Sequence, residues 1–442
     1  TRWVRDTIIN LREVPVLDAN ASSSTKKSTW FLDHRYSIPF DFIADAVAKS
    51  DSTYVSEDYS VTTLFIGNEL EYSNYTRYYT KASAVDSLEF KRMDAKAYLR
   101  LQPWSPDALL SKIDVGARTW SDTYLDMLEG GISKRHVSSS ASAYAAAGGR
   151  YHSNFDWDAK AQLVFAGARK GDADLTARAG LRFYPFRKAR KSPVSFEAKA
   201  SVALSSPNHY QSRMYSHDET FRWDLQLEKI RQTRLEASLN VPYWNLSAKV
   251  GYSALSNNLY YEDPGIIKQN PDPMSVLSAS LRKDFCIGGW LHLDNRLLYQ
   301  HSTRQEVVPV PELTANLRYY AQFVVQKAED GKSNVMVMQL GVNLWANTPW
   351  NAPGWCAETG RFYNQTSELY TNGPWFDVFM NIQWKKACIF VRMQNLGQGW
   401  PMEQNDYFSA HRRIVTMAGM PGLKIGITWP FYPDAPMRKA VR

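Results

Sequence analysis

Residues 155–165 read FDWDAKAQLVF, so apolar side chains alternate with mostly polar ones along the stretch. Successive side chains of a β-strand point to opposite faces, and this alternation therefore predicts a strand with one apolar and one polar face. The same pattern recurs over 175–183, 194–204 and 221–228. No segment shows a sustained apolar stripe of helical period with capping residues, so the chain is predicted to be all-β.

The length of the alternating runs distinguishes a membrane barrel from a soluble β protein. Soluble strands usually have about five or six residues, whereas these runs reach about 10–14, and a tilted membrane-spanning strand needs roughly 9–11. Aromatic residues gather near the ends of runs, as at Phe183-Tyr184 and Tyr243-Trp244, where membrane barrels carry aromatic girdles. We therefore expect a transmembrane antiparallel β barrel, with a large soluble β protein as the alternative.

Composition excludes several other classes of protein. The chain has 442 residues, of which 44% are hydrophobic and 22% are charged, and such a composition is not typical of a disordered protein. No stretch approaches the roughly 18 apolar residues of a membrane helix. The 52 basic residues outnumber the 44 acidic ones, but the two kinds are interspersed, so we expect no nucleic-acid partner.

Eighteen alternating runs can be marked along the sequence, and the ninth of them covers 214–228. Bacterial barrels have short periplasmic turns and long extracellular loops. If the last strand ends in the periplasm, the pairs Pro242-Tyr243, Gly288-Gly289 and Lys385-Lys386 become periplasmic turns. The expected extracellular loops are then 258–273, 348–373 and 398–421.

The N-terminal half of the chain does not fit this orientation. Its longer connections, 76–87 and 125–137, fall on the periplasmic side, so one or two of the marked runs are not separate strands. We therefore expect about sixteen strands, within a range of roughly 14–18. The barrel is predicted over 28–432, after a periplasmic extension or small plug at 1–27 and before a basic tail at 433–442.

The last strand carries a candidate membrane-insertion signal. One face presents a row of apolar residues that ends in aromatics: Leu423, Ile425, Ile427, Trp429 and Phe431. Such a row resembles the terminal signal by which outer-membrane barrels engage their insertion machinery, although an ordinary amphipathic last strand would look similar. Pro430 departs from the pattern, because proline cannot donate to a strand ladder, and ten residues follow Tyr432.

The C-terminal section resembles the putative porin family of the Bacteroidota. The matching segments are Phe376–Phe379, Lys385–Arg392, Asn395–Gly399, Tyr407–Ser409 and Gly426–Phe431, and His217–Asp224 matches farther upstream. The clear match covers about the last 70 residues. The resemblance implies an outer-membrane β barrel that depends on the barrel insertion machinery, and it indicates location and fold more firmly than activity.

The polar positions of the runs are the candidate lining of a lumen. They are Lys112, Asp114, Arg118, Asp156, Asp158, Lys160, Arg178, Arg182, Glu197, Lys199, Arg222, Asp224, Arg234, Lys249 and Arg282. Charges that face one another across a pore set its ion preference. Alternatively, the same residues pair across strands and fill the interior as a structural lattice of salt bridges.

Other chemistry is weakly indicated. The cluster of His209, His217, Asp218 and Glu219 has no recognised metal spacing, and no nucleophile elbow or phosphate loop is present. We expect no metal, no cofactor and no enzymatic activity. The cysteines Cys286, Cys356 and Cys388 also lack metal-ligand spacing, and a disulfide between Cys286 and Cys388 stays open.

Tryptophans in the expected loop 348–373 are candidates for an external contact. Trp350 and Trp355 lie near Pro349 and Pro353, which stiffen the segment, and exposed aromatics on a stiff loop suit a protein or glycan partner. The alternative is that they anchor the membrane interface or pack within the loop itself.

Together these features predict a porin-like channel of the bacterial outer membrane, for passive diffusion of small polar solutes. The alternative is a non-conducting barrel subunit of a larger outer-membrane complex, such as protein insertion or secretion machinery, that acts through its loops. Expected partners are membrane lipid, the insertion machinery and, for the alternative, other outer-membrane proteins or lipoproteins.

Overall fold

The computed structural model describes most of the chain. The described residues are 21–39, 62–81, 84–102, 107–127, 133–186, 192–329, 334–367, 369, 375–394, 396, 408–409, 414–415 and 422–429. Across these ranges, no helix has the length and apolar character needed to cross a membrane.

One antiparallel sheet of 17 strands dominates the structure. We call its members the wall strands. They are β1 (Ala21–Pro39), β2 (Thr62–Lys81), β3 (Ala84–Leu101), β4 (Lys112–Met127), β5 (Ser133–Tyr151), β6 (Phe155–Gly167), β7 (Ala173–Phe183), β8 (Val194–Ser205), β11 (Ile230–Val241), β12 (Leu246–Ser256), β15 (Met274–Ile287), β16 (Leu291–Ser302), β17 (Leu313–Lys327), β18 (Asn334–Asn347), β21 (Trp375–Trp384), β22 (Ala387–Gln394) and β25 (Gly422–Thr428).

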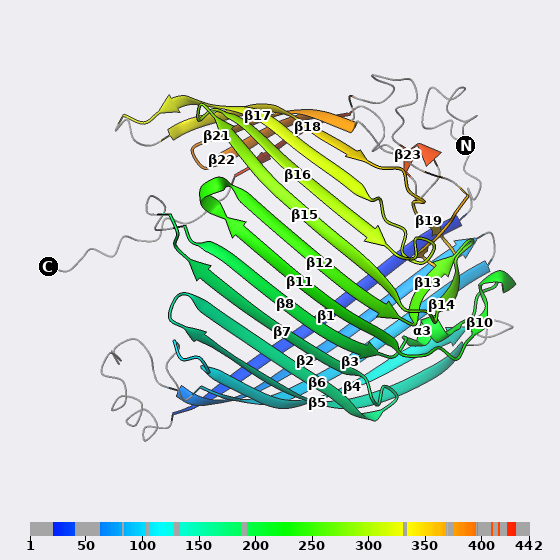
Figure 1. Cartoon of the computed structure of the whole chain (residues 1–442). Coiled ribbons are helices and arrows are strands. Elements are labelled where there is room, and N and C mark those ends of the chain that lie inside the picture. Colours follow the sequence, from blue (N-terminus) through cyan, green and yellow to red (C-terminus); the bar gives the residue numbers. More distant parts are fainter. Residues whose placement is uncertain are drawn as a thin grey trace, which may run out of the picture.

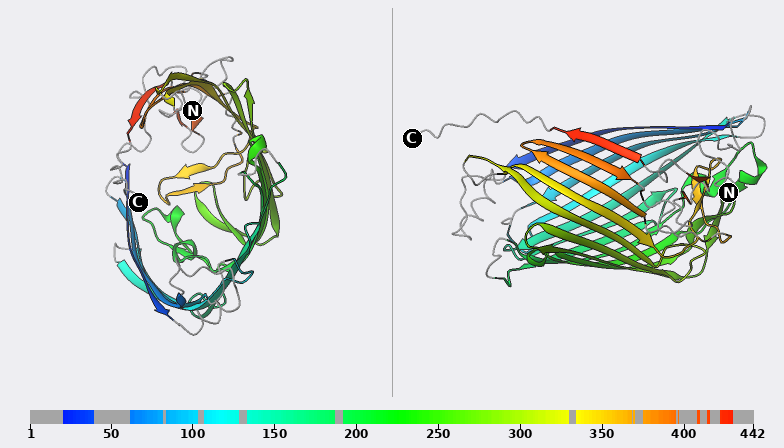
Figure 2. Two further views of the ribbon diagram at one scale, coloured as in Figure 1. Left: turned by 90° about the vertical axis from the view of Figure 1, so that its left-hand side faces the viewer. Right: turned by 90° about the horizontal axis from the view of Figure 1, so that it is seen from above.

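Each wall strand pairs with the next one along the chain, and the sheet curls into a ring (Figures 1 and 2). The end strands β1 and β25 lie on the same side of that ring in both views of Figure 2. No pairing between these two strands is recorded among the described residues. The all-β, antiparallel prediction is confirmed, whereas the expected count of sixteen strands is too low.

The error in counting has an identifiable source in the run 214–228. This segment forms no wall strand. It contains only the two-residue strands β9 (Arg213–Met214) and β10 (Trp223–Asp224), with the short 3-10 helix η4 (Glu219–Phe221) between them. Its alternation is genuine, but the side chains of Phe221 and Trp223 are buried in a cluster of loop residues instead of facing lipid. When this run is not counted as a wall strand, the expected connections 76–87 and 125–137 move to the same end of the ring as the long connections of the C-terminal half.

The expected tight turns all lie at one end of the ring, which we call the turn end (Figure 1). The backbone conformations explain why. The Gly288-Gly289 turn has φ values of 60° and 76°, and Lys385 has a φ of 51°, a left-handed region that suits tight hairpins. Pro242 begins the 3-10 helix η5 (Pro242–Trp244). The long connections 257–273 and 348–374 lie at the opposite end, the loop end.

Two expected segments at the chain ends fall partly or wholly outside the described residues. β1 already begins at Ala21, so the expected boundary at residue 27 lies inside a wall strand. Residues 1–20 and 430–442 are not described, and most of the expected loop 398–421 is not described either.

The outer face of the ring is apolar and the inner face is polar. Leu175, Leu181 and Leu235 point outward and are about half exposed, while their neighbours Arg178, Arg182 and Glu236 point inward and form ion pairs. Strand alternation produces both faces from one sequence. An outward apolar surface of this kind suits hydrocarbon, because apolar side chains exposed to water lose the hydrophobic stabilisation.

Aromatic rings on the inner face lie against glycines of the adjacent strand. Tyr98 of β3 covers Gly67 of β2, and a Cβ atom on Gly67 would lie 2.2 Å from the Tyr98 Cζ atom. Tyr144 of β5 covers Gly116 of β4 in the same way. A Cβ atom at either position would meet the tyrosine ring, so these glycines allow the close packing of neighbouring strands.

Wall strands differ greatly in length. β2 has 20 residues and β5 has 19, whereas β22 has 8 and β25 has 7. At the loop end β5 extends past β6, whose ladder with β5 begins only at Ser140. β1 has 19 residues and pairs with β2 as far as Lys81, so the strands β1–β5 form a one-sided extension of the wall.

Candidate functional site

The inner face of β3 and β4 carries a ladder of paired charges. Arg100 donates two hydrogen bonds of 2.7 Å to Asp114, and Arg118 binds Asp94 through both of its carboxylate oxygens, with a shortest distance of 2.6 Å. The planar guanidinium matches a carboxylate in this two-point geometry. These charges are neutralised locally, so they contribute little to a field across the lumen.

A second cluster centres on Arg178 of β7. Its guanidinium lies 2.8 Å from Asp156, 3.3 Å from Asp158 and 2.8 Å from Glu197. Arg182 also approaches Asp156, at 2.9 Å. Carboxylates outnumber guanidinium groups in this cluster, so its net charge is negative.

Lysines of the predicted lining behave differently from arginines. Every arginine in that set pairs with a carboxylate, including Arg234 with Glu236 and Arg282 with Asp294. No ion pair is recorded, within the described part of the chain, for the lysines of the set: Lys112, Lys160, Lys199 and Lys249. The arginines of the set thus lie in ion pairs on the inner face and the lysines do not, while a role of these residues in lining an open lumen stays a prediction.

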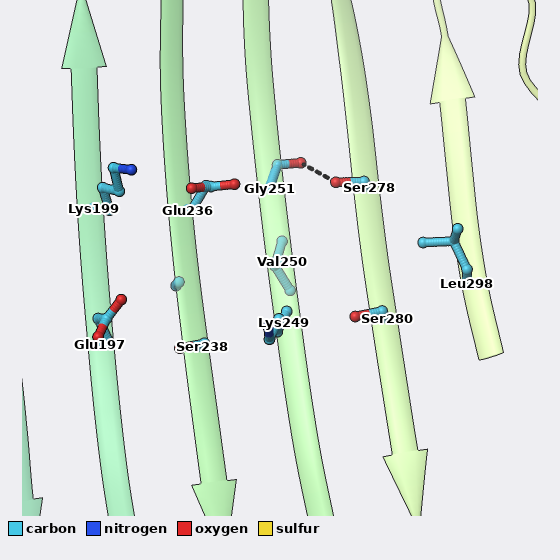
Figure 3. Close-up of a pocket in the computed structure, with 11 residues that line it drawn as sticks. Glu197, Lys199, Glu236, Ser238, Lys249, Val250, Gly251, Ser278, Ser280 and Leu298 are labelled. Atoms are coloured by element: carbon cyan, nitrogen blue, oxygen red, sulfur yellow. Dashed lines mark hydrogen bonds between the residues drawn. The ribbon is translucent and has the colours of Figure 1, made fainter. Parts of the chain in front are cut away.

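Two of these lysines line one inner hollow, shown in Figure 3. Lys199 and Glu197 project from β8, Glu236 from β11 and Lys249 from β12. Ser278 and Ser280 of β15 complete the polar lining. A flexible ammonium group beside hydroxyls can attract an anion without holding it rigidly.

The predicted lining is not wholly on the wall. Arg222 and Asp224 lie in the connection 206–229, where the Arg222 side chain donates to the Ser216 carbonyl at 2.7 Å and Asp224 pairs with Arg213. The other predicted residues of the set lie on wall strands. The sequence misplaced these two because the run 214–228 alternates as a wall strand does.

The opposite part of the inner face is rich in side-chain amides. Gln339 of β18 donates to Gln322 of β17 at 2.8 Å and accepts from Asn381 of β21 at 3.2 Å. Further polar residues line the same hollow, namely Gln383, Cys388, Arg392, Gln394 and Lys424. Amides both donate and accept hydrogen bonds, so this side of the lumen suits uncharged polar solutes.

Three long connections fold into the ring at the loop end, as Figure 2 shows. They are 206–229 with the short helix α3 (His209–Ser212), 257–273 with the hairpin β13–β14 (Asn258–Glu262 and Ile266–Asn270), and 348–374 with the hairpin β19–β20 (Gly354–Cys356 and Arg361–Tyr363). We call this set the loop cap.

A shared apolar cluster holds the loop cap together. Met214 and Phe221 from the first connection pack with Ile267 from the second and Cys356 from the third. Burial of the Cys356 thiol raises its pKa above the ordinary value, since the charged thiolate is disfavoured there. The three connections thus form one packed unit that narrows the loop end.

The loop cap is attached to β2 by hydrogen bonds. The Arg77 guanidinium donates to the carbonyl oxygens of Ala357 and Glu358, the latter at 2.9 Å. The Glu358 carboxylate accepts from the Tyr79 hydroxyl at 3.2 Å and pairs with Lys81 at 3.3 Å. Arg77 is only 6% exposed, so this attachment is largely shielded from water.

A second attachment joins the loop cap to β3 and β4. The hydroxyl of Tyr210 lies 2.6 Å from the Glu89 carbonyl and 2.9 Å from the Leu125 carbonyl. Burial raises the pKa of Tyr210, so it stays a neutral donor. His209 Nε2 lies 2.6 Å from Asp126, and His217 contacts Asp86 at 2.8 Å.

These contacts were not predicted from the sequence. Arg77 and Glu358 are 281 residues apart, and no local pattern links them. The histidines His209 and His217 each bind one carboxylate of the wall. The described residues contain no group of three or more metal-ligating side chains that could hold a metal. The expectation of no metal stays a prediction.

Trp350 and Trp355 lie in the loop cap. The Trp355 ring contacts Phe362 edge-on across the β19–β20 hairpin, with centroids 4.8 Å apart, and it remains 42% exposed. Trp350 is half-buried. Trp355 therefore packs against its own hairpin and keeps part of its ring exposed, and an external contact of either tryptophan stays a prediction.

Two remaining expectations concern the cysteines and the last strand. All three cysteines are free, so the disulfide between Cys286 and Cys388 does not form. Leu423, Ile425, Ile427 and Trp429 are each 60–67% exposed on the outer face. Phe431 lies outside the described residues, and an insertion signal at this row stays a prediction.

Comparisons with known proteins agree on the kind of molecule. A family model described as "Putative porin" matches residues 5–433. No curated protein matches the sequence. Among solved structures, the chain is similar to the copper transporter OprC, with a TM-score of 0.61 and 10% identity over 93% of this chain and 65% of that one.

Two receptors of Pseudomonas aeruginosa are also similar in fold. A variant of the ferric enterobactin receptor PfeA has a TM-score of 0.58 and 12% identity, over 92% of this chain and 61% of that one. The siderophore receptor PirA has a TM-score of 0.53 and 10% identity, over 86% and 62%. The chain therefore spans between 61% and 65% of the length of these three proteins. At such low identity the similarity concerns the fold alone.

Proposed function

Since this chain belongs to the putative porin family, which places it in the outer membrane, we propose that it is a channel for passive diffusion of small polar solutes. The loop end faces the cell exterior in this proposal, because long loops of bacterial barrels are extracellular. Fold similarity to outer-membrane receptors and transporters supports a transport role.

The observation that carries this proposal is the polar inner face. Many of its charges form arginine–carboxylate pairs, whereas no ion pair is recorded among the described residues for the ammonium groups of Lys112, Lys160, Lys199 and Lys249. A ring of this strand number leaves an aqueous interior when side chains do not fill it. The lysines favour small anions, while the amide side of the lumen favours neutral polar solutes.

Planar-bilayer recording of the purified chain tests the channel directly. Discrete conductance steps that grow with salt concentration and are modestly selective for anions are the expected result. Swelling of liposomes in isotonic solutions of polyols of increasing size would then measure the largest solute that passes the loop cap. A folded protein that gives no conductance and no swelling would exclude passive diffusion.

The loop cap favours a second candidate function. A mouth filled by packed connections suits a non-conducting subunit that docks other envelope proteins through its loops, as in an insertion or secretion complex. The copper and siderophore proteins of similar fold are much longer, so their activities are not transferred. Gentle extraction from the native membrane distinguishes the candidates, because a stoichiometric partner bound through residues 206–229 or 348–374 supports the second one.

A further inference from the structure

Cys286, His292 and Asp284 form a chain of contacts on the inner face near the turn end. Cys286 and Asp284 are two residues apart on β15, and His292 on β16 lies directly opposite Cys286 in the ladder. The Cys286 Sγ atom lies 3.8 Å from Nε2 of His292, and Nδ1 of the same ring lies 3.1 Å from Oδ2 of Asp284. Each ring nitrogen thus faces a different partner.

The contact with Asp284 determines the tautomer of the imidazole. An ionised carboxylate only accepts hydrogen bonds, so Nδ1 of a neutral His292 carries the proton and Nε2 keeps its lone pair toward the thiol. His292 is the one hydrogen-bond partner recorded for the Asp284 side chain in the described part of the chain, and its other oxygen, Oδ1, is buried without one. The carboxylate is therefore committed to orienting the ring.

Stacking holds the ring from another direction. The Tyr320 ring of β17 lies parallel to His292, with centroids 4.7 Å apart and an angle of 4° between the planes. Three adjacent strands therefore fix the imidazole: β15 through Asp284, β16 through its own backbone and β17 through Tyr320. A nucleophile, a base and a group that orients the base are the parts that activate a cysteine in unrelated proteins.

The thiol is open to solvent inside the ring. Cys286 is exposed, and it shares the inner face with Arg282 and Asp284 because the three are spaced by two along β15. Cys388 is exposed as well, but no histidine contact is recorded for it, and Cys356 is buried in the loop cap. Cys388 can therefore serve as an exposed control thiol without a histidine, and Cys356 as a buried one.

A metal ion is a weaker explanation of the same residues. Cys286 and His292 would supply two ligands, with Asp284 behind the imidazole. Even an open site would need a third protein ligand and a closed one a fourth, and the described residues contain no group of three or more such side chains that could hold a metal.

We propose that Cys286 is a reactive thiol, activated by His292 and Asp284, that exchanges with small disulfides entering the lumen. Nε2 of His292 accepts the thiol proton, and the sulfur of Cys286 attacks one sulfur of the disulfide. A new S–S bond forms at Cys286 as the old one breaks, and the departing thiolate takes the proton from Nε2. Cys286 is oxidised, and the released half of the disulfide is reduced, so electrons and protons balance.

Reaction with dipyridyl disulfide tests this assignment, because each exchange releases an absorbing thiopyridone. The test uses the full chain in detergent micelles, with two variants that keep one exposed cysteine each. C356S/C388S retains Cys286, and C286S/C356S retains Cys388. An ordinary thiol is only a few per cent ionised at neutral pH, so we expect Cys286 to react about tenfold faster than Cys388.

Removing the base or its orienting group should abolish this advantage. His292→Gln in the Cys286-only chain is expected to lower the rate to that of Cys388, and Asp284→Asn to lower it partway. Heat-modifiable mobility on gels verifies that each variant is folded, and Asp284→Asn serves alone if His292→Gln does not fold. Equal rates for the two cysteines, or rates unchanged in both variants, would overturn the proposal.

The pH dependence supplies a readout that a structural histidine would not change. With His292 present, the rate should fall less steeply below neutral pH than in His292→Gln, since an imidazolium stabilises the thiolate. The other titratable or charged groups that face this site are Asp284, Asp294, Arg282, Arg296, Arg318 and Tyr320, and both chains retain them. Identical pH profiles would overturn the role of His292. None of these exchange rates depends on conductance. The proposal for Cys286 can therefore fail while the channel proposal holds, and the reverse.

Discussion

Arg92 of β3 and Asp122 of β4 lie directly opposite each other, joined by two parallel hydrogen bonds of 2.6 and 2.8 Å. Asp122 is only 1% exposed, and Arg169 approaches its other side at 3.7 Å. This carboxylate therefore lies between two guanidinium groups at the base of the one-sided extension of the wall.

Asp122→Ala should destabilise the barrel strongly, because it leaves the half-buried Arg92 without its counter-charge. The expected loss is about 3–5 kcal/mol, typical of removing one partner from a buried ion pair. Unfolding in guanidinium, followed by tryptophan fluorescence, measures the change. Asp224→Ala is the matched control, since its pair with Arg213 is exposed and should contribute less than about 1 kcal/mol. Equal losses of unfolding free energy in the two variants would contradict the expectation that a buried ion pair contributes more to stability than an exposed one.

Arg77→Met should release the β19–β20 hairpin from the wall. The substitution keeps an unbranched apolar stem but removes the donors to Ala357 and Glu358. If the chain conducts, single-channel conductance and the size limit in liposome swelling should both increase. Lys268→Met is the control, since Lys268 pairs only with Glu262 at the surface of the cap. Unchanged conductance in Arg77→Met would show that the hairpin does not restrict the pathway.

Gly67→Ala should conflict with the ring of Tyr98. A Cβ atom would lie 2.2 Å from Tyr98 Cζ, so the ring must move, at a cost of about 1–3 kcal/mol for overpacking. Tyr98→Ala in the same chain should recover most of that particular loss. Unfolding midpoints of the two single variants and the double variant give the coupling between them, and simple additivity would contradict the predicted clash.

Replacing both Lys199 and Lys249 by Gln should reduce anion preference. These ammonium groups line the inner hollow and have no recorded ion pair, so their charge acts on the lumen. Reversal potentials in a salt gradient should shift toward cations by roughly a factor of two in the permeability ratio. Arg100→Gln combined with Asp114→Asn is the contrasting variant, because it removes a neutral ion pair and should leave the permeability ratio unchanged. Arg178→Glu should shift selectivity in the same direction as the lysine variants.

Trp429→Ala with Phe431→Ala should impair assembly into the outer membrane. Trp429 directly follows β25 and is 60% exposed, so it continues the apolar outer row of that strand with a large aromatic side chain. Surface levels and heat-modifiable mobility in cells measure assembly. Lys424→Ala, on the inner face of the same strand, should assemble normally. Normal assembly of the double variant would reject the insertion signal.

Much of this fold could be predicted from local sequence alone. The alternation that begins at Phe155 identifies a strand and its lipid-facing side, because both depend on period two and on nothing distant. Glycines at 288 and 289 likewise mark a tight hairpin, since their backbone needs positive φ. These features explain why most runs and turns were placed correctly.

The loop cap could not be predicted in this way. Phe221 and Trp223 alternate like wall residues, but their partners Ile267 and Cys356 come from other connections. Burial in a cluster and burial in lipid produce the same alternation over eight residues. Charge pairs on the inner face could not be predicted from local sequence either. Arg178 meets Glu197 only because of the register between β7 and β8, and the sequence alone does not give that register.

The one-sided extension of the wall has a consequence for how the molecule is seen from outside the cell. On its outer face the apolar Leu99 and Val115 give way, toward the loop end, to a mixed surface in which Lys91, Thr123 and Arg135 lie among Tyr78, Val85 and Val137. Charged side chains such as Lys91 and Arg135 do not belong in hydrocarbon. With the loop end outside, as proposed, this part of β1–β5 would stand above the lipid as a crescent-shaped collar on one flank. Antibodies, phages and surface proteases would then meet an asymmetric particle, whose tall flank is more accessible than the flank of the short strands β22 and β25.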